Sequence, residues 1–119
     1  MASGKERGAQ RPNDPPLLIL MGLAAGPKHG YALMQDIADF AGVRLGPGTL
    51  YGAIGRLEER GLIEAIGAPD RRRPYRLTAA GAASLQATLD GLRAIVDEGT
   101  TRLAARRAAP RRAAFGGSA

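Results

Sequence analysis

The side chains best suited to chemistry in this sequence are cationic, and nearly all of them are arginines. Of the 17 basic residues only Lys5 and Lys28 are lysine, and three arginines, Arg71, Arg72 and Arg73, are consecutive. A guanidinium group binds phosphate through two parallel hydrogen bonds and is more weakly hydrated than an ammonium group. The net charge of +6 and the pI near 10.7 therefore indicate a polyanionic partner. A coding bias towards Arg, Ala and Gly would explain the same composition, so this argument does not stand alone.

The residues that usually carry out catalysis or bind metals are almost absent. The chain has no Cys and a single histidine, His29, so disulfides, thiolate metal sites and paired-histidine sites are excluded. Asp36 and Asp39 lie near each other in sequence, but no nucleophile or glycine-rich phosphate loop accompanies them. We expect His29 to cap or pack a helix. The sequence therefore predicts no catalytic residue, no metal site and no cofactor.

One stretch, residues 46–62, combines an apolar helix face with a face of small or polar groups. Pro47 suits a first helical turn, and Gly61 stands where a helix end favours positive φ. The apolar residues are Leu50, Ile54 and Leu57, and the opposite face holds Thr49, Gly52, Gly55, Arg56 and Glu59, with Tyr51 beside it. Such a helix can approach a grooved surface such as DNA closely. An ordinary surface helix with chance glycines fits the same pattern.

The length of 119 residues suits one domain. The longest apolar run, residues 17–25, is too short to span a bilayer. Basic residues before this run and small residues after it would also suit a secretory signal. The pair Pro15-Pro16 favours instead the start of a helix in a cytoplasmic protein without a membrane segment.

The pattern along the chain predicts two more helices before residue 46, at about residues 15–25 and 31–40. In the second of these, Leu33, Met34, Ile37 and Phe40 are expected on the apolar face, and Gln35, Asp36 and Asp39 on the side facing water. Residues 43–45 are expected to be extended or to form a short strand.

Alternating residues then predict a β-hairpin with strands at 62–66 and 73–77. Its connecting turn places Arg71, Arg72 and Arg73 at or near the tip. A long final helix follows, with Thr78 suited to cap its first turn.

The final helix, residues 79–107, carries apolar residues at the 3-4 spacing of a heptad repeat. They are Ala82, Leu85, Leu89, Leu92, Val96 and Leu103. Because only about three heptads are present, we expect this helix to pack on the partner subunit of a homodimer as well as on its own domain. A stripe that packs wholly on its own domain is the alternative.

The predicted fold class is mainly α with a small β-hairpin: a winged helix-turn-helix domain at 15–78 and a dimerisation helix at 79–107. Residues 1–14 and 108–119 are expected to be tails, the second one basic. A B-DNA major groove accepts one helix, and an arginine-rich wing can reach phosphates or a flanking minor groove. The candidate DNA-binding residues from the residue pattern are Gly48, Thr49, Tyr51, Arg56, Arg71, Arg72 and Arg73.

Three segments resemble the PadR family of bacterial transcriptional regulators, and they occur in the family's order. They are HGYALMQDI at 29–37, GTLYGAIGRLEERGLIE at 48–64 and RRRPYRLTAAG at 71–81. The resemblance implies that Thr49 and Tyr51 contact DNA, adds Tyr31 as a further contact, and assigns Tyr75 and Leu77 to packing. Where the family usually has a proline after Leu-Tyr, this chain has Gly52.

The resemblance also implies a homodimer that acts mostly as a repressor on a pseudo-palindromic operator. Some family members release DNA when a small hydrophobic effector binds near the dimer interface, and those that stack the compound use a tryptophan on the last helix. This chain has no Trp, so aromatic stacking is unsupported here.

Two other functions stay open. A nucleoid-like protein would bind DNA through charge without sequence preference, and only a regulator would show a large ratio of specific to nonspecific affinity. A winged-helix module that binds protein would normally carry a less basic wing. Among regulators, the MarR family usually has an additional N-terminal dimerisation helix.

Overall fold

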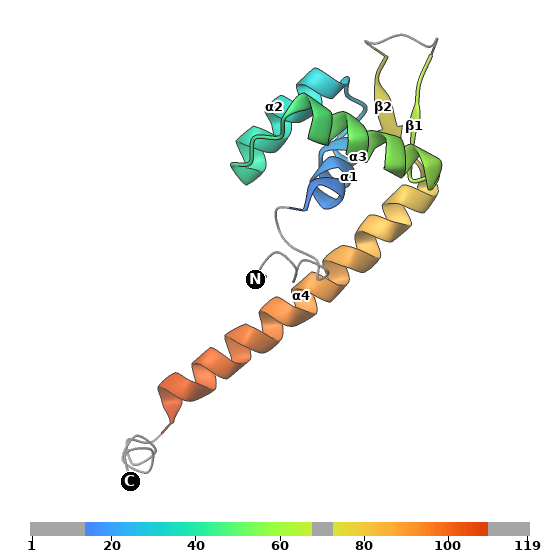
Figure 1. Ribbon diagram of the computed structural model, residues 1–119. Coiled ribbons are helices and arrows are strands. Elements are labelled where there is room, and N and C mark those ends of the chain that lie inside the picture. Colours follow the sequence, from blue (N-terminus) through green and yellow to red (C-terminus); the bar gives the residue numbers. More distant parts are fainter. Residues whose placement is uncertain (1–13, 68–72, 110–119) are drawn as a thin grey trace. The chain divides into compact units, whose positions relative to one another are not determined.

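The computed structural model describes residues 14–67 and 73–109, which form helices and a single hairpin (Figure 1). The elements are α1 (Pro15–Ala24), α2 (Gly30–Ala41), α3 (Pro47–Glu59), β1 (Ile63–Ala65), β2 (Tyr75–Leu77) and α4 (Ala79–Ala108). The predicted fold class, a winged helix-turn-helix followed by a long helix, is confirmed. The two expected tails, apart from Asp14, Ala108 and Ala109, and residues 68–72 of the turn lie outside the described residues. The chain divides into two compact units, one ending at Thr88 and one beginning at Leu89.

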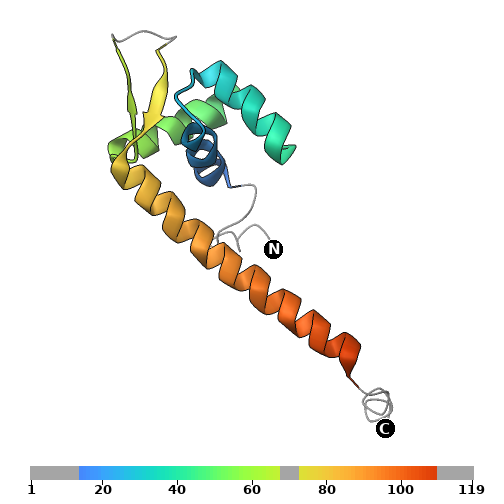
Figure 2. The ribbon, with the colours of Figure 1, turned by 180° about the vertical axis from the view of Figure 1, so that it is seen from behind.

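Helix α1 is the buried centre of the first unit. It begins at Pro15 and Pro16, which fit the first two helical positions because those positions need no hydrogen-bonded N–H. Its apolar residues lie on nearly all sides, and the ribbon views show it among α2, α3 and the base of the hairpin (Figures 1 and 2). The buried members are Leu17, Leu18, Ile19, Leu20, Gly22 and Leu23.

The other helices cover α1 with the apolar faces that the sequence predicts. Leu33 and Ile37 of α2 are completely buried. The predicted stripe of α3 is confirmed, since Leu50, Ile54 and Leu57 are at most 2% exposed. Helices α2 and α3 thus each bury one face against the central α1, which is the arrangement a helix-turn-helix needs to hold its third helix rigidly.

Three local expectations were wrong or incomplete. Residues 43–45 form no strand and simply link α2 to α3. Phe40, expected on the apolar face, lies in the last turn of α2 and is 43% exposed. Asp36 does not simply face water, since Lys28 Nζ lies 3.7 Å from its Oδ2.

The hairpin pairs β1 with β2 in antiparallel register, with Glu64 opposite Arg76. These two side chains form an ion pair of 2.7 Å on the exposed face, while Tyr75 is buried. The strands are shorter than predicted, at three residues each. A bridge adds Lys28 to the sheet: its N–H donates to Tyr75 O (3.1 Å) and its carbonyl accepts from Tyr75 N–H (2.9 Å). The segment between α1 and α2 therefore also extends the sheet.

The start of α4 is fastened to the hairpin, and the predicted cap is confirmed. Thr78 Oγ1 accepts the N–H of Gly81 (3.0 Å) and donates to the carbonyl of Gly61 (2.7 Å). Gly81 is buried, and a Cβ there would lie 2.9 Å from the backbone carbonyl carbon of Leu62. Only a glycine lets the first turn of α4 come this close to the backbone that enters β1.

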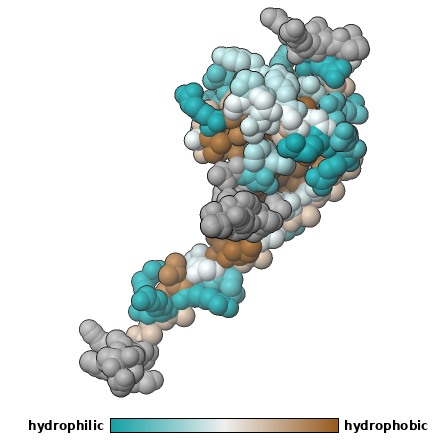
Figure 3. Space-filling model, in the orientation of Figure 1, coloured by the Kyte–Doolittle hydropathy of each residue, from teal (hydrophilic) through white to brown (hydrophobic). Residues whose placement is uncertain are grey.

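The described part of the second unit, residues 89–109, is helical to Ala108 and contains no fully buried side chain. Hydrophobic and hydrophilic atoms alternate on its visible surface (Figure 3). Its ion pairs join Arg93 to Asp90 (3.6 Å) and Arg102 to Glu98 (2.7 Å), each within the helix. In the part of the chain that the structure describes, no helix combines the length and hydrophobicity needed to cross a bilayer.

Candidate nucleic-acid interface

The exposed side of α3 is open and nearly flat. We call Gly48, Thr49, Gly52, Gly55 and Arg56 the outer face of α3. A Cβ added at Gly48 or Gly55 would meet no atom within 4 Å, and one at Gly52 would meet only Arg56 Nη1 at 3.7 Å. The helix begins at Pro47, and its first N–H groups have no partner within the helix. Those donors suit a phosphate oxygen, so the outer face can lie against a nucleic-acid backbone.

Two arginines lie on this face or in the link that precedes its helix. Arg44 lies in the link before α3 and Arg56 lies on α3 itself, and both are exposed. Within residues 14–67 and 73–109 neither of them forms an ion pair, whereas Lys28, Arg76, Arg93 and Arg102 all do. Unpaired guanidinium groups are free to bind phosphate without first breaking an internal contact.

Tyr51 lies at the junction of α3 and α2. Its side chain is 43% exposed, and its ring covers Gly30, because a Cβ at Gly30 would lie 2.6 Å from Tyr51 Cζ. Tyr31 follows Gly30 in the first turn of α2 and is 66% exposed. Its hydroxyl oxygen accepts a hydrogen bond of 3.1 Å from Gln35 Nε2. The two candidate tyrosines thus lie at one end of α2, close to the outer face of α3.

Sequence reasoning missed Gly30 and Gln35 as part of this region. The helix was predicted at about residues 31–40, so Gly30 lay just before its expected start. Its buried position shows that the missing side chain makes room for Tyr51. Gln35 was placed on the water-facing side correctly, but its partner one turn earlier could not be inferred.

Only one arginine of the predicted wing cluster lies among the described residues. The guanidinium carbon of Arg73 lies 6.0 Å from the centroid of the Tyr75 ring, at the outer limit of a cation–π contact. Arg73 is half-buried. Arg71 and Arg72 lie outside the described residues, so their role in binding stays a prediction.

The predicted interface stripe of α4 is divided between two environments. Leu85 is only 6% exposed and belongs to the core of the first unit, so little of its surface remains for contact with a partner subunit. Leu89 and Leu92 are half-buried. Val96 and Leu103 are 63% and 58% exposed. Packing of the stripe on its own domain is therefore confirmed for Leu85, whereas the exposed Val96 and Leu103 contradict the alternative of a stripe packed wholly on its own domain.

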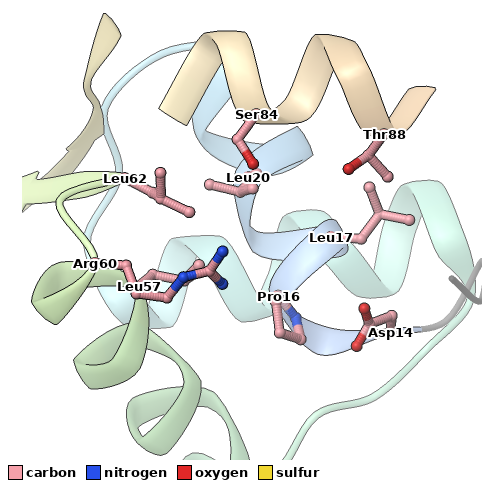
Figure 4. Close-up of a pocket in the computed structure, with 9 residues that line it drawn as sticks. All are labelled: Asp14, Pro16, Leu17, Leu20, Leu57, Arg60, Leu62, Ser84 and Thr88. Carbon is pink, nitrogen blue, oxygen red and sulfur yellow. The ribbon is translucent and has the colours of Figure 1, made fainter. Parts of the chain in front are cut away.

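Small cavities also occur among the described residues of the first unit. One, of about 170 Å³, lies between α1, the end of α3 and the second and third turns of α4. Figure 4 shows the Arg60 side chain reaching into it, with the hydroxyls of Ser84 and Thr88 on the side of α4. Another, of about 190 Å³, lies between α2 and the link before α3. No group of three or more potential metal ligands occurs among the described residues.

An open helix face with an exposed arginine, on a three-helix core with a β-hairpin, is typical of a winged-helix DNA-binding protein. The model of the Transcriptional regulator PadR-like family matches residues 19–87, more than half of the chain, and the protein belongs to that family. Its members are DNA-binding transcription regulators and not enzymes, so the resemblance seen in the sequence is confirmed.

Solved structures of similar proteins agree with this assignment. A PadR family transcription regulator from Clostridium difficile has a TM-score of 0.66 at 24% identity, covering 75% of this chain and 97% of that one. A transcriptional regulator from Clostridium thermocellum has a TM-score of 0.62 at 26% identity, covering 72% and 89%. A PadR family regulator from Eggerthella lenta has a TM-score of 0.57 at 28% identity, covering 72% and 80%.

A relative in sequence comes from a mobile element. An uncharacterized 37.1 kDa protein in a transposon of Streptomyces fradiae is 49% identical over 71 residues. The match covers 60% of this chain and 21% of that protein, so the chain corresponds to about a fifth of that relative's length.

Proposed function

We propose that this protein is a cytoplasmic homodimeric repressor that binds a pseudo-palindromic operator. The observation that carries the proposal is the outer face of α3, which is unobstructed at its glycines and includes Arg56, an exposed arginine without an ion pair among the described residues. In this arrangement α3 enters the major groove, where Thr49 and Tyr51 contact base edges or phosphates. Tyr31 and the wing arginines, Arg71, Arg72 and Arg73, bind the flanking backbone.

The exposed stripe of α4 supports the homodimer. Val96 and Leu103 are more than half exposed, and fully burying such a side chain contributes about 1.5–3 kcal/mol. Self-association through Leu89, Leu92, Val96 and Leu103 would remove this surface from water. A two-fold dimer would present two copies of α3 to two half-sites, which is why a pseudo-palindrome is expected.

Selection of bound sequences from a random duplex pool at physiological salt tests the proposal. We expect an enriched inverted repeat whose half-sites are about one helical turn, or a multiple of it, apart. Repression is then tested with this repeat placed across a promoter that drives a reporter gene. The other outcome is DNA binding that enriches no sequence and is lost as the salt concentration rises. It would support a nucleoid-like protein that recognises only the charge of DNA.

We further propose that a small hydrophobic effector releases the operator by entering the cavity of about 170 Å³ in the first unit. Leu17, Leu20, Leu57 and Leu62 supply an apolar lining, and Arg60 supplies one cation. A cavity of this size accommodates about one aromatic ring, which is smaller than the usual space for a drug-sized ligand. Benzoate and toluene are suitable probes, and release of labelled operator by either supports an effector site. Unchanged operator binding at saturating concentrations of both would contradict it.

A further inference from the structure

We propose that Gly30 is a positioning residue for DNA binding, because its missing side chain allows Tyr51 to lie across the first turn of α2. The contact joins the DNA-facing helix α3 to the same short segment, residues 28–30, that holds the hairpin. This inference rests on the proposed function, since it assigns a consequence for DNA binding to the placement of Tyr51.

The contact between the two residues is direct. Gly30 is buried although it is the first residue of a helix. A Cβ built on it would collide with the Tyr51 hydroxyl oxygen and would lie 2.6 Å from Cζ and 3.0 Å from Cε1. Real Cβ atoms essentially never approach another heavy atom this closely, so no other residue type fits here while Tyr51 keeps its position.

The segment that carries Gly30 is itself fixed from several sides. The backbone of Lys28 exchanges two hydrogen bonds with Tyr75 in β2, of 3.1 and 2.9 Å. Its ammonium group donates to the carbonyl of Gly22 at 2.7 Å and lies 3.7 Å from an Asp36 oxygen. The hairpin, α1, α2 and, through Gly30, α3 therefore all contact one three-residue segment. This gives the recognition helix and the wing a common anchor.

The nature of the obstructing atoms predicts what a methyl group at Gly30 does. They belong to the end of a tyrosine side chain that is 43% exposed, so the ring can rotate outward without moving the backbone. Gly81 offers the contrast, because a Cβ there meets the backbone of Leu62. The Gly30→Ala variant should therefore stay folded while Tyr51 leaves its position.

A double-mutant cycle tests the proposal, with Gly30→Ala, Tyr51→Ala and the double variant measured by fluorescence anisotropy on a labelled duplex from the selection. If no sequence is enriched, a mixed-sequence duplex at low salt serves as the probe. We expect each single variant to lose roughly tenfold in affinity, and the double variant to lose no more than Tyr51→Ala alone. Gly91→Ala is the control, since it adds the same methyl group to a helix where no atom lies within 4 Å.

Thermal unfolding and NMR separate positioning from stability. The wild type should show a nuclear Overhauser effect between the Tyr51 ring protons and the Gly30 α protons, and Gly30→Ala should lose the Tyr51 contact at an unchanged melting temperature. The proposal would be overturned if Gly30→Ala lowered the affinity for DNA by the same factor in the wild-type protein and in the Tyr51→Ala variant. Unchanged affinity of Tyr51→Ala would also overturn it, while an enriched operator would leave the proposed regulator standing.

Discussion

The two units of this chain treat their hydrophobic side chains in opposite ways. In the first unit, which ends at Thr88, the buried hydrophobic residues run from Leu17 to Leu85 and surround α1. In the described part of the second unit no side chain is fully buried, and Ile95 and Val96 are 69% and 63% exposed. The first unit therefore has a core of its own, while the described part of the second unit, residues 89–109, has no buried core.

This difference concerns how each unit is stabilised. Burial of apolar surface is the main favourable term in folding, and the first unit obtains it within one chain. An isolated helix is marginal in water without packing of an apolar face. The ion pairs of the second unit, Arg93 with Asp90 and Arg102 with Glu98, are exposed and each add only about 0.3–0.5 kcal/mol. Association with a second copy would supply the missing burial.

The largest expected effect concerns Leu85. It lies on the same apolar stripe of α4 as Val96, but it is buried in the core of the first unit whereas Val96 is exposed. Leu85→Ala should lower the free energy of unfolding by about 2–5 kcal/mol, because it opens a cavity in the core of the first unit. The matched variant Val96→Ala should instead weaken self-association. Urea unfolding and sedimentation equilibrium distinguish the two. If Leu85→Ala leaves the free energy of unfolding unchanged, the buried side chain of Leu85 does not help to stabilise the first unit, and the contrast between the two units fails.

The second prediction places a charge in the middle of the exposed stripe. Leu89→Glu should raise the dissociation constant of the dimer by on the order of 100-fold, since an unpaired carboxylate would be buried at the interface. Ala94→Glu is the matched control, because position 94 is on the opposite side of α4 and is exposed. If light scattering still finds a dimer for Leu89→Glu, the dimer interface lies outside this stripe.

Local patterns were sufficient to predict most of the fold. Apolar spacing located the buried face of α3, and Thr78 marked the start of α4 because its cap depends on neighbouring residues only. The contacts that sequence reasoning missed join distant segments, such as Lys28 with Tyr75 and Gly30 with Tyr51. Periodicity gives the direction of a side chain on its own element, but it does not say which element lies opposite.

The same limit applies to the candidate site. The exposed positions of Thr49 and Arg56 follow from helical spacing, so they could be predicted. The open space above Gly48 and Gly55 could not, since it depends on what the rest of the unit leaves uncovered. Spacing alone also placed Leu85 and Val96 on one stripe without separating a residue in its own core from an exposed one.

The third prediction tests how tightly the first unit holds α4. Gly81→Ala would place a methyl group against the backbone of Leu62, which cannot rotate away as a side chain can. We expect a loss of about 1–3 kcal/mol in the free energy of unfolding, as for overpacked positions in other cores. The change should appear as a lower melting temperature, accompanied by a shift of the Leu62 amide signal in NMR spectra. Stability at or above the wild-type value would mean that the first turn of α4 is held more loosely than this close contact implies.

The smallest effect is expected from the same substitution in the second unit, where it should have the opposite sign. Gly91 lies in α4, and a methyl group added to it would have no atom within 4 Å, so Gly91→Ala removes a helix-weakening residue without any collision. The gain should be at most about 1 kcal/mol, the difference in helix propensity between glycine and alanine. Circular dichroism during thermal unfolding measures it, with Gly81→Ala as the reference of opposite sign. If both substitutions destabilise, the exposed face at Gly91 is occupied in the assembled protein, and the interface must extend beyond the heptad stripe to include it.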